Sequence, residues 1–173
     1  MGFIINAIFF LISFATLAVA GGFATDSARR TTTINNYDNN ELLISAHQKL
    51  TIAAVITWIT IAVLITLVVL LIIFGGPEAA NWLNWIIYGF LILTLGAVAA
   101  VGILSAWGAS QIQQAEVPDD NLSRRNAIIA AVLAIVGFVA VVVILLIRIF
   151  SGGEEEEETD VTSQLTSIAG LFS

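Results

Sequence analysis

The chain has no cysteine, one histidine and two prolines. Without cysteine, disulfide bonds, thiolate metal sites and cysteine nucleophiles are all excluded. Only six residues are basic against 13 acidic ones, a formal net charge of −7, so clusters for binding a phosphate backbone are lacking. We therefore expect no direct, sequence-specific nucleic-acid binding. Charged residues make up 11% and hydrophobic residues 58% of the 173 positions. This balance indicates that lipid is the solvent of the protein.

Four apolar runs take up most of the sequence: residues 3–20, 50–74, 82–107 and 127–150. A hydrocarbon core of about 30 Å is crossed by roughly 20 apolar residues in a helix. No run contains a charged residue before Arg148. The sequence predicts an all-α, integral membrane four-helix protein with short amphipathic extensions. We expect one membrane domain over residues 1–150, followed by an acidic tail over residues 151–173.

The first run has an alternative interpretation. Its last residues, Leu17–Ala20, stand before Gly21 and Gly22 and resemble the small-residue cleavage site of a signal peptide. No lysine or arginine precedes the run, so the basic segment of a signal peptide is missing. We expect a retained membrane span, with a cleaved signal as the alternative.

Basic residues are unevenly divided between the two sides of the predicted membrane. Four spans place both termini on one side and the connecting segments 21–49 and 108–125 on the other. Five of the six basic residues lie in these segments: Arg29, Arg30, Lys49, Arg124 and Arg125. Because basic residues in short loops stay in the cytosol, we expect cytosolic loops and both termini on the opposite side.

Small residues recur at helical spacing in the third and fourth runs. Helices in lipid associate through close packing, so such residues mark contact faces. The candidate helix-packing residues are Gly89, Gly96, Ala100, Gly102, Ala106, Ala127, Ala130, Ala134 and Gly137. We expect the two stripes to pack on each other, with packing on another subunit as the alternative. The candidate membrane-interface residues, near the ends of the runs, are Trp82, Trp85, Trp107 and Arg148.

The second helix is predicted to begin before the membrane, near Asn39. Asp38 with Glu41 three residues later resembles a capping box. From there to Phe74 a helix is about 52 Å long, so its first turns form an amphipathic stalk. The apolar face of this stalk consists of Leu42, Leu43, Ala46 and Leu50. The threonines of the run are expected to bond carbonyls of their own helix.

Residue types used in catalysis or metal binding do not occur together in the sequence. The only histidine, His47, has no partner at metal-ligand or catalytic spacing. No ionisable residue lies at mid-depth of a run, where transporters and pumps place them. We therefore expect no enzyme activity, no catalytic residue, no cofactor and no metal site.

The acidic tail combines a charge run with an apolar stripe. Its charge run consists of Glu154, Glu155, Glu156, Glu157 and Glu158. Further along, four apolar residues share one face of a short predicted helix: Val161, Leu165, Ile168 and Leu171. One hypothesis is that the stripe docks on a protein partner while the glutamates meet a basic patch. The alternative is a loose, solvated tail. We expect docking, with these nine residues as the docking site.

Residues 40–50, running into residues 53–58, resemble part of a viral protein family. The similarity is to small multi-span membrane proteins of large icosahedral double-stranded DNA viruses, where an acidic-Leu…Ala-His…Leu segment leads into a span bearing Ala and Trp. The resemblance covers about twenty residues. It implies a structural, minor capsid protein of the virion inner membrane, with the capsid shell as partner.

Three functional hypotheses follow from the sequence. The first is a structural membrane protein that tethers a lipid bilayer to a protein shell through its termini. Basic loop residues would then meet lipid phosphates or the genome side of the membrane. The second is a supernumerary subunit of a large membrane complex. The third is a holin-like pore former, for which the threonines of the second run offer the only polar stripe.

Overall fold

The computed structural model describes residues 2–74, 80–116 and 121–151. Within these ranges the chain is helical and contains no strand. Its elements are α1 (Gly2–Thr31), the 3-10 helix η1 (Tyr37–Asn39), α2 (Glu41–Phe74), α3 (Ala80–Gln114) and α4 (Leu122–Ser151). The all-α, four-helix prediction is confirmed.

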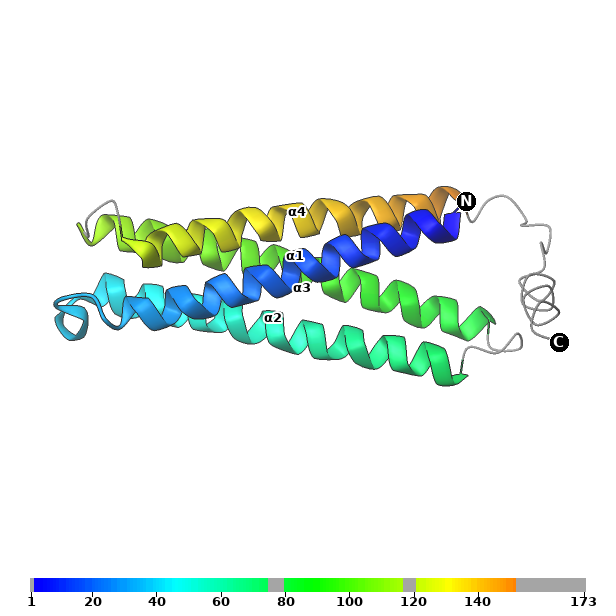
Figure 1. The fold of residues 1–173 in the computed structure, drawn as a ribbon, viewed down its shortest axis with the longest axis horizontal. Coiled ribbons are helices and arrows are strands. Elements are labelled where there is room, and N and C mark those ends of the chain that lie inside the picture. Colours follow the sequence, from blue (N-terminus) through cyan, green and yellow to red (C-terminus); the bar gives the residue numbers. More distant parts are fainter. Residues whose placement is uncertain (1, 75–79, 117–120, 152–173) are drawn as a thin grey trace, which may run out of the picture.

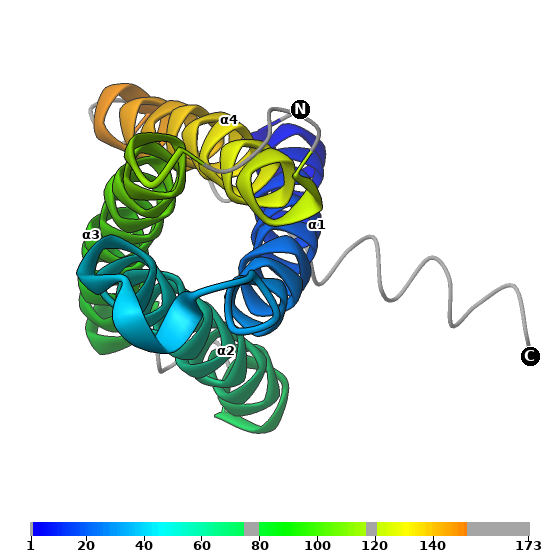
Figure 2. The ribbon, with the colours of Figure 1, turned by 90° about the vertical axis from the view of Figure 1, so that its left-hand side faces the viewer.

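The four long helices form an antiparallel bundle in chain order (Figure 1). Viewed along the bundle, each helix lies beside its sequence neighbours, and α4 closes the ring against α1 (Figure 2). Diagonal contact between α1 and α3 is slight. The start of α1 and the end of α4 share one end of the bundle, called here the terminal end. The end of α1 and the starts of α2 and α4 share the other, called the loop end.

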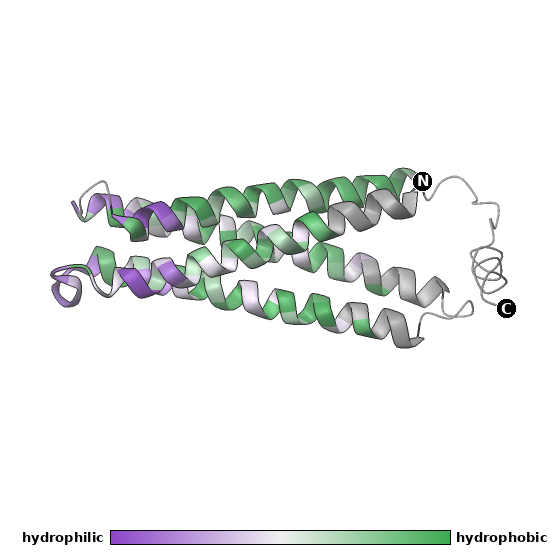
Figure 3. Cartoon of the chain, viewed as in Figure 1, coloured by the Kyte–Doolittle hydropathy of each residue, from purple (hydrophilic) through white to green (hydrophobic). Residues whose placement is uncertain are grey.

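Each helix is long and apolar enough to cross a membrane. The helices have 30 to 35 residues, so at about 1.5 Å per residue they exceed a hydrocarbon core of about 30 Å. The apolar segments within the described residues are Leu11–Thr31, Glu41–Thr66, Tyr88–Gln114 and Leu122–Ile147. Hydrophilic residues gather at the loop end, while the middle of the bundle is apolar (Figure 3). This arrangement is compatible with an integral, multi-pass membrane protein.

Small and aliphatic side chains fill the middle of the bundle. Its central cluster takes residues from all four helices: Leu17, Ala24, Ala53, Ala54, Ile61, Leu64, Val98, Val101, Ala130 and Ala134. The outer surface is apolar as well, with Val132, Ile135 and Val139 of α4 more than half exposed. A bundle that is apolar inside and outside suits a lipid solvent, because lipid imposes no cost on exposed aliphatic side chains.

The first helix runs further than its apolar run indicated. It continues past Ala20 through Gly21 and Gly22 and ends at Thr31. Two glycines in a helix interior are unfavourable by themselves. Here packing outweighs that cost, because Ala24 and Ala28 beyond them are buried in the bundle.

The connecting segments also contribute to the bundle. Much of residues 21–49 and 108–125 is helix, and these extensions enclose a second core cluster at the loop end. Its members are Ala28, Leu43, Ala46, Leu50, Ala109, Ile112 and Ala127. The predicted apolar face of the stalk packs within the bundle, since Leu43, Ala46 and Leu50 are buried. Gly108 permits this packing, since a Cβ there would lie 2.9 Å from Leu50 Cγ.

The start of α2 differs in detail from the prediction. Asp38 lies within η1, and the capping side chain is that of Asn40 instead. Its Oδ1 accepts hydrogen bonds from the backbone N–H groups of Leu42 and Leu43, at 3.0 and 3.4 Å. Asparagine caps as well as aspartate does, and here it stands immediately before the helix. The continuous helix to Phe74 is confirmed.

Three of the four threonine hydroxyls of α2 bond their own helix, as expected; within the described residues, Thr51 makes no such bond. Thr57, Thr60 and Thr66 donate to the carbonyl oxygens four residues earlier at 2.7 to 2.9 Å. Such bonding satisfies a hydroxyl without any partner on another helix.

Gly21 and Gly22 form a matched pair for testing the α1–α2 contact. A Cβ on Gly21 would lie 2.5 Å from Thr57 Cγ2 and 3.2 Å from Thr57 Cβ, whereas one on Gly22 meets nothing within 4 Å. We expect Gly21→Ala to lower the free energy of unfolding by about 1–3 kcal/mol through overpacking. Gly22→Ala should raise it by about 0.5–1 kcal/mol, because alanine favours helix. Circular dichroism during SDS titration of the micellar protein measures both values.

A second substitution identifies the clash itself. Thr57→Ser removes Cγ2 and keeps the hydroxyl, so it should recover most of the stability lost in Gly21→Ala. Equal effects of the two glycine substitutions would contradict the close approach of α1 and α2.

Candidate functional site: the polar layer at the loop end

Polar side chains from all four helices meet at the loop end of the bundle. We call this group the polar layer. Its members are Asp26, Ser27 and Thr31 of α1, Ser45, His47 and Lys49 of α2, Gln111 of α3, and Ser123 and Asn126 of α4. Hydrogen bonds within it join α1 to α4, α1 to α2, and α2 to α3.

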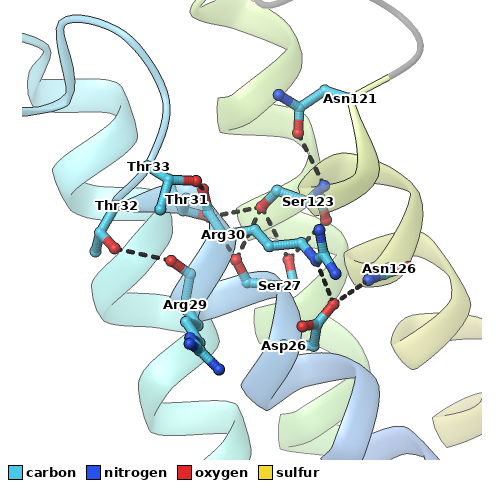
Figure 4. Close-up of polar contacts among 10 residues, drawn as sticks. All are labelled: Asp26, Ser27, Arg29, Arg30, Thr31, Thr32, Thr33, Asn121, Ser123 and Asn126. Atoms are coloured by element: carbon cyan, nitrogen blue, oxygen red, sulfur yellow. Dashed lines mark hydrogen bonds and ion pairs between the residues drawn. The ribbon is translucent and has the colours of Figure 1, made fainter.

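The α1–α4 contact is built from reciprocal serine bonds (Figure 4). Ser27 Oγ donates to the Ser123 carbonyl oxygen at 2.6 Å, and Ser123 Oγ donates to the Ser27 carbonyl oxygen at 2.9 Å. Thr31 Oγ1 also donates to the Ser27 carbonyl at 2.8 Å and lies 2.7 Å from Ser123 Oγ. All three residues are buried. Side-chain bonds to a carbonyl oxygen of a neighbouring helix require the two backbones to lie close together. We call the contact made by Ser27, Thr31 and Ser123 the seam; it fixes the register of α1 against α4.

Asp26 links the same two helices at their surface. Its Oδ2 accepts from Asn126 Nδ2 on α4 and from Arg30 Nε on α1, both at 2.6 Å. The Asp26–Arg30 pair is half exposed, and ion pairs of this kind contribute about 0–1 kcal/mol. Its main effect is therefore to hold the Arg30 guanidinium in place (Figure 4).

Lys49 joins α2 to α3. Its Nζ donates to Ser45 Oγ at 2.6 Å and to Gln111 Oε1 at 2.9 Å, and it lies 4.4 Å from the centre of the Trp107 ring. Gln111 Nε2 in turn donates to Ser45 Oγ at 3.1 Å. The ammonium group thus contacts two oxygen acceptors and an aromatic face, and these contacts hold α2 against α3.

His47 joins α2 to α1. Its Nδ1 lies 2.9 Å from the Ala28 carbonyl oxygen, and its ring meets Tyr37 edge to face at 5.9 Å. Thr25, one turn before Ala28 on α1, makes another contact with α2: Trp58 Nε1 donates to Thr25 Oγ1 at 3.2 Å while about half of the Trp58 residue stays exposed.

The start of α4 is fixed by a cap that the sequence analysis did not anticipate. Asn121 Oδ1 accepts from the backbone N–H of Ser123 at 2.8 Å. This bond is one of those that satisfy the free N–H groups of a helix N-terminus. It also places Ser123 where it meets Ser27.

Small residues of α4 lie inside the bundle, whereas most of those singled out on α3 lie outside. Ala127, Ala130, Ala134 and Gly137 are buried, and a Cβ on Gly137 would lie 3.1 Å from Thr16 Oγ1. On α3, Gly89, Gly96 and Ala106 are exposed, and Ala100 is half buried. Gly102 is where the two stripes meet, since a Cβ there would lie 3.4 Å from Ala134 Cβ.

The other residues proposed from the sequence divide into two groups. Trp107 is 56% exposed, and the Lys49 ammonium group lies over the face of its ring. The side chains of Trp82, Trp85 and Arg148 lie outside the described part of the structure. So do the docking residues of the tail: Glu154, Glu155, Glu156, Glu157, Glu158, Val161, Leu165, Ile168 and Leu171.

The hydrogen bonds of the polar layer join neighbouring helices of the bundle. Over residues 2–74, 80–116 and 121–151, no group of three or more His, Asp and Glu residues is arranged to hold a metal ion. Sequence reasoning missed the contributions of Asp26, Ser27, Ser123 and Asn126 to this site. Their signal was the spacing of short polar residues, Ser27 with Thr31 and Ser123 with Asn126, which places each pair on one helix face.

Ser123→Ala tests whether the seam stabilises the bundle. We expect the free energy of unfolding to fall by about 1 kcal/mol, because the substitution removes a hydrogen bond between buried groups in a membrane protein. Ser110→Ala makes the same chemical change at an exposed position of α3 and should shift stability by less than about 0.5 kcal/mol. Thermal melts of the two variants in one detergent compare them. A loss as large in Ser110→Ala as in Ser123→Ala would contradict the special role of the seam.

Comparison with known proteins assigns the chain to no family. No family model, no curated protein and no solved structure matches the chain.

Proposed function

We propose that the chain is a structural, non-catalytic membrane protein that tethers a lipid bilayer to a protein shell. The observation that carries the proposal is the use of the interhelical hydrogen bonds. Five polar side chains form hydrogen bonds to neighbouring helices of the same chain: Ser27, Ser45, Gln111, Ser123 and Asn126. Polar groups that hold a bundle together support the role of an anchor better than that of a transporter or an enzyme.

The buried polar residues of the described helices support the same conclusion. They are Ser13, Ser27, Thr31, Thr57, Thr60, Thr94, Ser105, Ser123 and Asn126. All are uncharged, whereas proton relays and ion pathways in membranes use buried ionisable residues. Thr57 and Thr60 of α2 bond carbonyls of their own helix and are buried. This gives little support to a holin-like pore lined by α2.

The tether itself would be the tail that follows α4. In this proposal the four helices give a fixed base in the bilayer, and residues 154–171 bring glutamates and an apolar stripe to a protein partner. The resemblance of residues 40–58 to viral membrane proteins makes the capsid shell of a large DNA virus the partner we favour, with the virion inner membrane as the location.

A supernumerary subunit of a membrane complex is the second candidate. It is favoured by the exposed face of α3, where a Cβ added to Gly89 or Gly96 would meet nothing within 4 Å. Such a face permits close approach of another helix in the plane of the membrane. The two candidates differ in what the tail touches.

Orientation is tested with introduced cysteines, since the native chain has none. Thr32→Cys is an exposed position at the loop end, and Ser163→Cys is in the tail. We expect a membrane-impermeant maleimide to label Thr32→Cys once the plasma membrane alone is permeabilised, and Ser163→Cys only after the internal membranes are opened as well, because basic loops stay cytosolic. The parent chain is the unlabelled control. The reverse labelling pattern would overturn the proposed orientation.

Cross-linking tests the tether. In the assembled, membrane-intact particle, a carboxylate-to-lysine cross-linker should join Glu154–Glu158 to a shell protein, as read by mass spectrometry. Replacing Leu165 and Ile168 with Asp removes the apolar stripe and should abolish these cross-links.

Replacing Thr162 and Thr166 with Asp is the matched control, because it adds the same charge on another helix face. This control should leave the cross-links intact. Cross-links confined to other membrane subunits would favour the second candidate. A tail that gives no cross-links and is freely digested by protease would end the tether proposal.

A further inference from the structure

An open hollow lies beside the polar layer at the end of α1. It has a volume of about 300 Å³ and is lined by Asp26, Arg29, Arg30 and Thr33. These residues share one face of α1 and its continuation, at spacings of three and four. From this hollow we infer a binding site for the phosphate of an anionic phospholipid.

The charges in the hollow suit a single phosphate diester. Two guanidinium groups and one carboxylate give a net charge of about +1. Asp26 holds Arg30 through Nε at 2.6 Å, which fixes the guanidinium and leaves its two terminal nitrogens as further donors. Arg29 is exposed, and within the described residues no ion pair engages its side chain. Guanidinium groups bind phosphate oxygens well because their donors form a planar fork.

The hollow lies at the hydrophilic end of the bundle, where a membrane-spanning helix meets the lipid headgroups (Figure 3). Trp58 Nε1 is bonded to Thr25, the residue before Asp26, and tryptophan is enriched at the level of the headgroups. Arg29 is one helical turn closer to water than Thr25. Figure 4 shows its side chain extending back along α1, towards the span. Long basic side chains in this position reach phosphate oxygens at the edge of the hydrocarbon.

The neighbouring helix favours an anion as well. The C-terminal end of α1 carries partial negative charge, which by itself repels phosphate. The N-terminal end of α4, with the opposite partial charge, lies against it through the Ser27–Ser123 and Asp26–Asn126 bonds. The two helix-end charges therefore oppose each other, and the arginines decide the local potential.

General attraction of the loop end for anions is a poor alternative. In sequence, the connecting segments 21–49 and 108–125 carry five basic residues and six acidic ones: Asp26, Asp38, Glu41, Glu116, Asp119 and Asp120. A preference for anionic lipid must then come from the local arrangement of Arg29 and Arg30. This inference does not depend on what the tail binds.

The test uses the full-length protein in nanodiscs of phosphatidylcholine with a minor fraction of phosphatidylglycerol. After transfer to mild detergent, native mass spectrometry gives the ratio of the two lipids retained. We expect wild type to enrich phosphatidylglycerol, and Arg29→Gln and Arg30→Gln each to lower the enrichment about fivefold. Arg125→Gln removes an exposed charge at the same end but outside the hollow, and should retain the enrichment.

Asp26→Asn separates a built site from simple charge attraction. It makes the hollow more positive but releases Arg30, so a built site loses phosphatidylglycerol while a diffuse potential gains it. Three results would overturn the proposal. They are a stronger enrichment of phosphatidylglycerol in Asp26→Asn than in wild type, a loss in Arg125→Gln equal to that in Arg29→Gln and Arg30→Gln, and no lipid preference in wild type. Displacement of the lipid by soluble glycerol phosphate would assign the hollow to a free anion instead.

Discussion

Close approach of helix backbones is the condition on which the rest of this structure depends. Lipid tails are as apolar as leucine, so helices in a bilayer gain little from hiding aliphatic side chains and associate through tight packing. Gly21 brings α1 against Thr57 of α2, and Gly137 brings α4 against Thr16 of α1. Only at such distances do short side chains such as Ser27 and Ser123 reach the carbonyl oxygens of the neighbouring helix. The hydrogen bonds of the seam therefore depend on the close packing of the helices.

The hydrogen bonds of the polar layer then make one end of the bundle different from the other. Lys49, His47 and Asp26 each join two helices near the water-facing end, while the middle of the bundle is held by alanine, valine and leucine. Polar contacts in a membrane protein average less than about 1 kcal/mol each, so their contribution is to register more than to total stability. A fixed register at the loop end sets the positions of Arg29 and Arg30, on which the proposed lipid site depends.

Ser105 is an exception to this pattern. It is fully buried on α3, and its hydroxyl has no hydrogen-bond partner in the described structure. Elsewhere on the helices, hydroxyls such as Thr94 donate to the carbonyl four residues earlier, at 2.7 Å.

The number of helices, their apolar character and their alternating direction were determined by the sequence alone, because four long apolar runs leave a chain no other arrangement in lipid. The continuity of α2 from its polar start to Phe74 was equally predictable from helical spacing. Which residues meet across helices was decided only by the tertiary structure. Gly21 and Gly22 look alike in sequence, yet a side chain at one would collide with Thr57 and at the other would meet nothing within 4 Å. The small residues of α3 and α4 also look equivalent, but Ala134 is buried and Gly96 is exposed. The physical reason is that helix spacing fixes a face, whereas the rotation of each helix about its axis is set by its neighbours in the bundle.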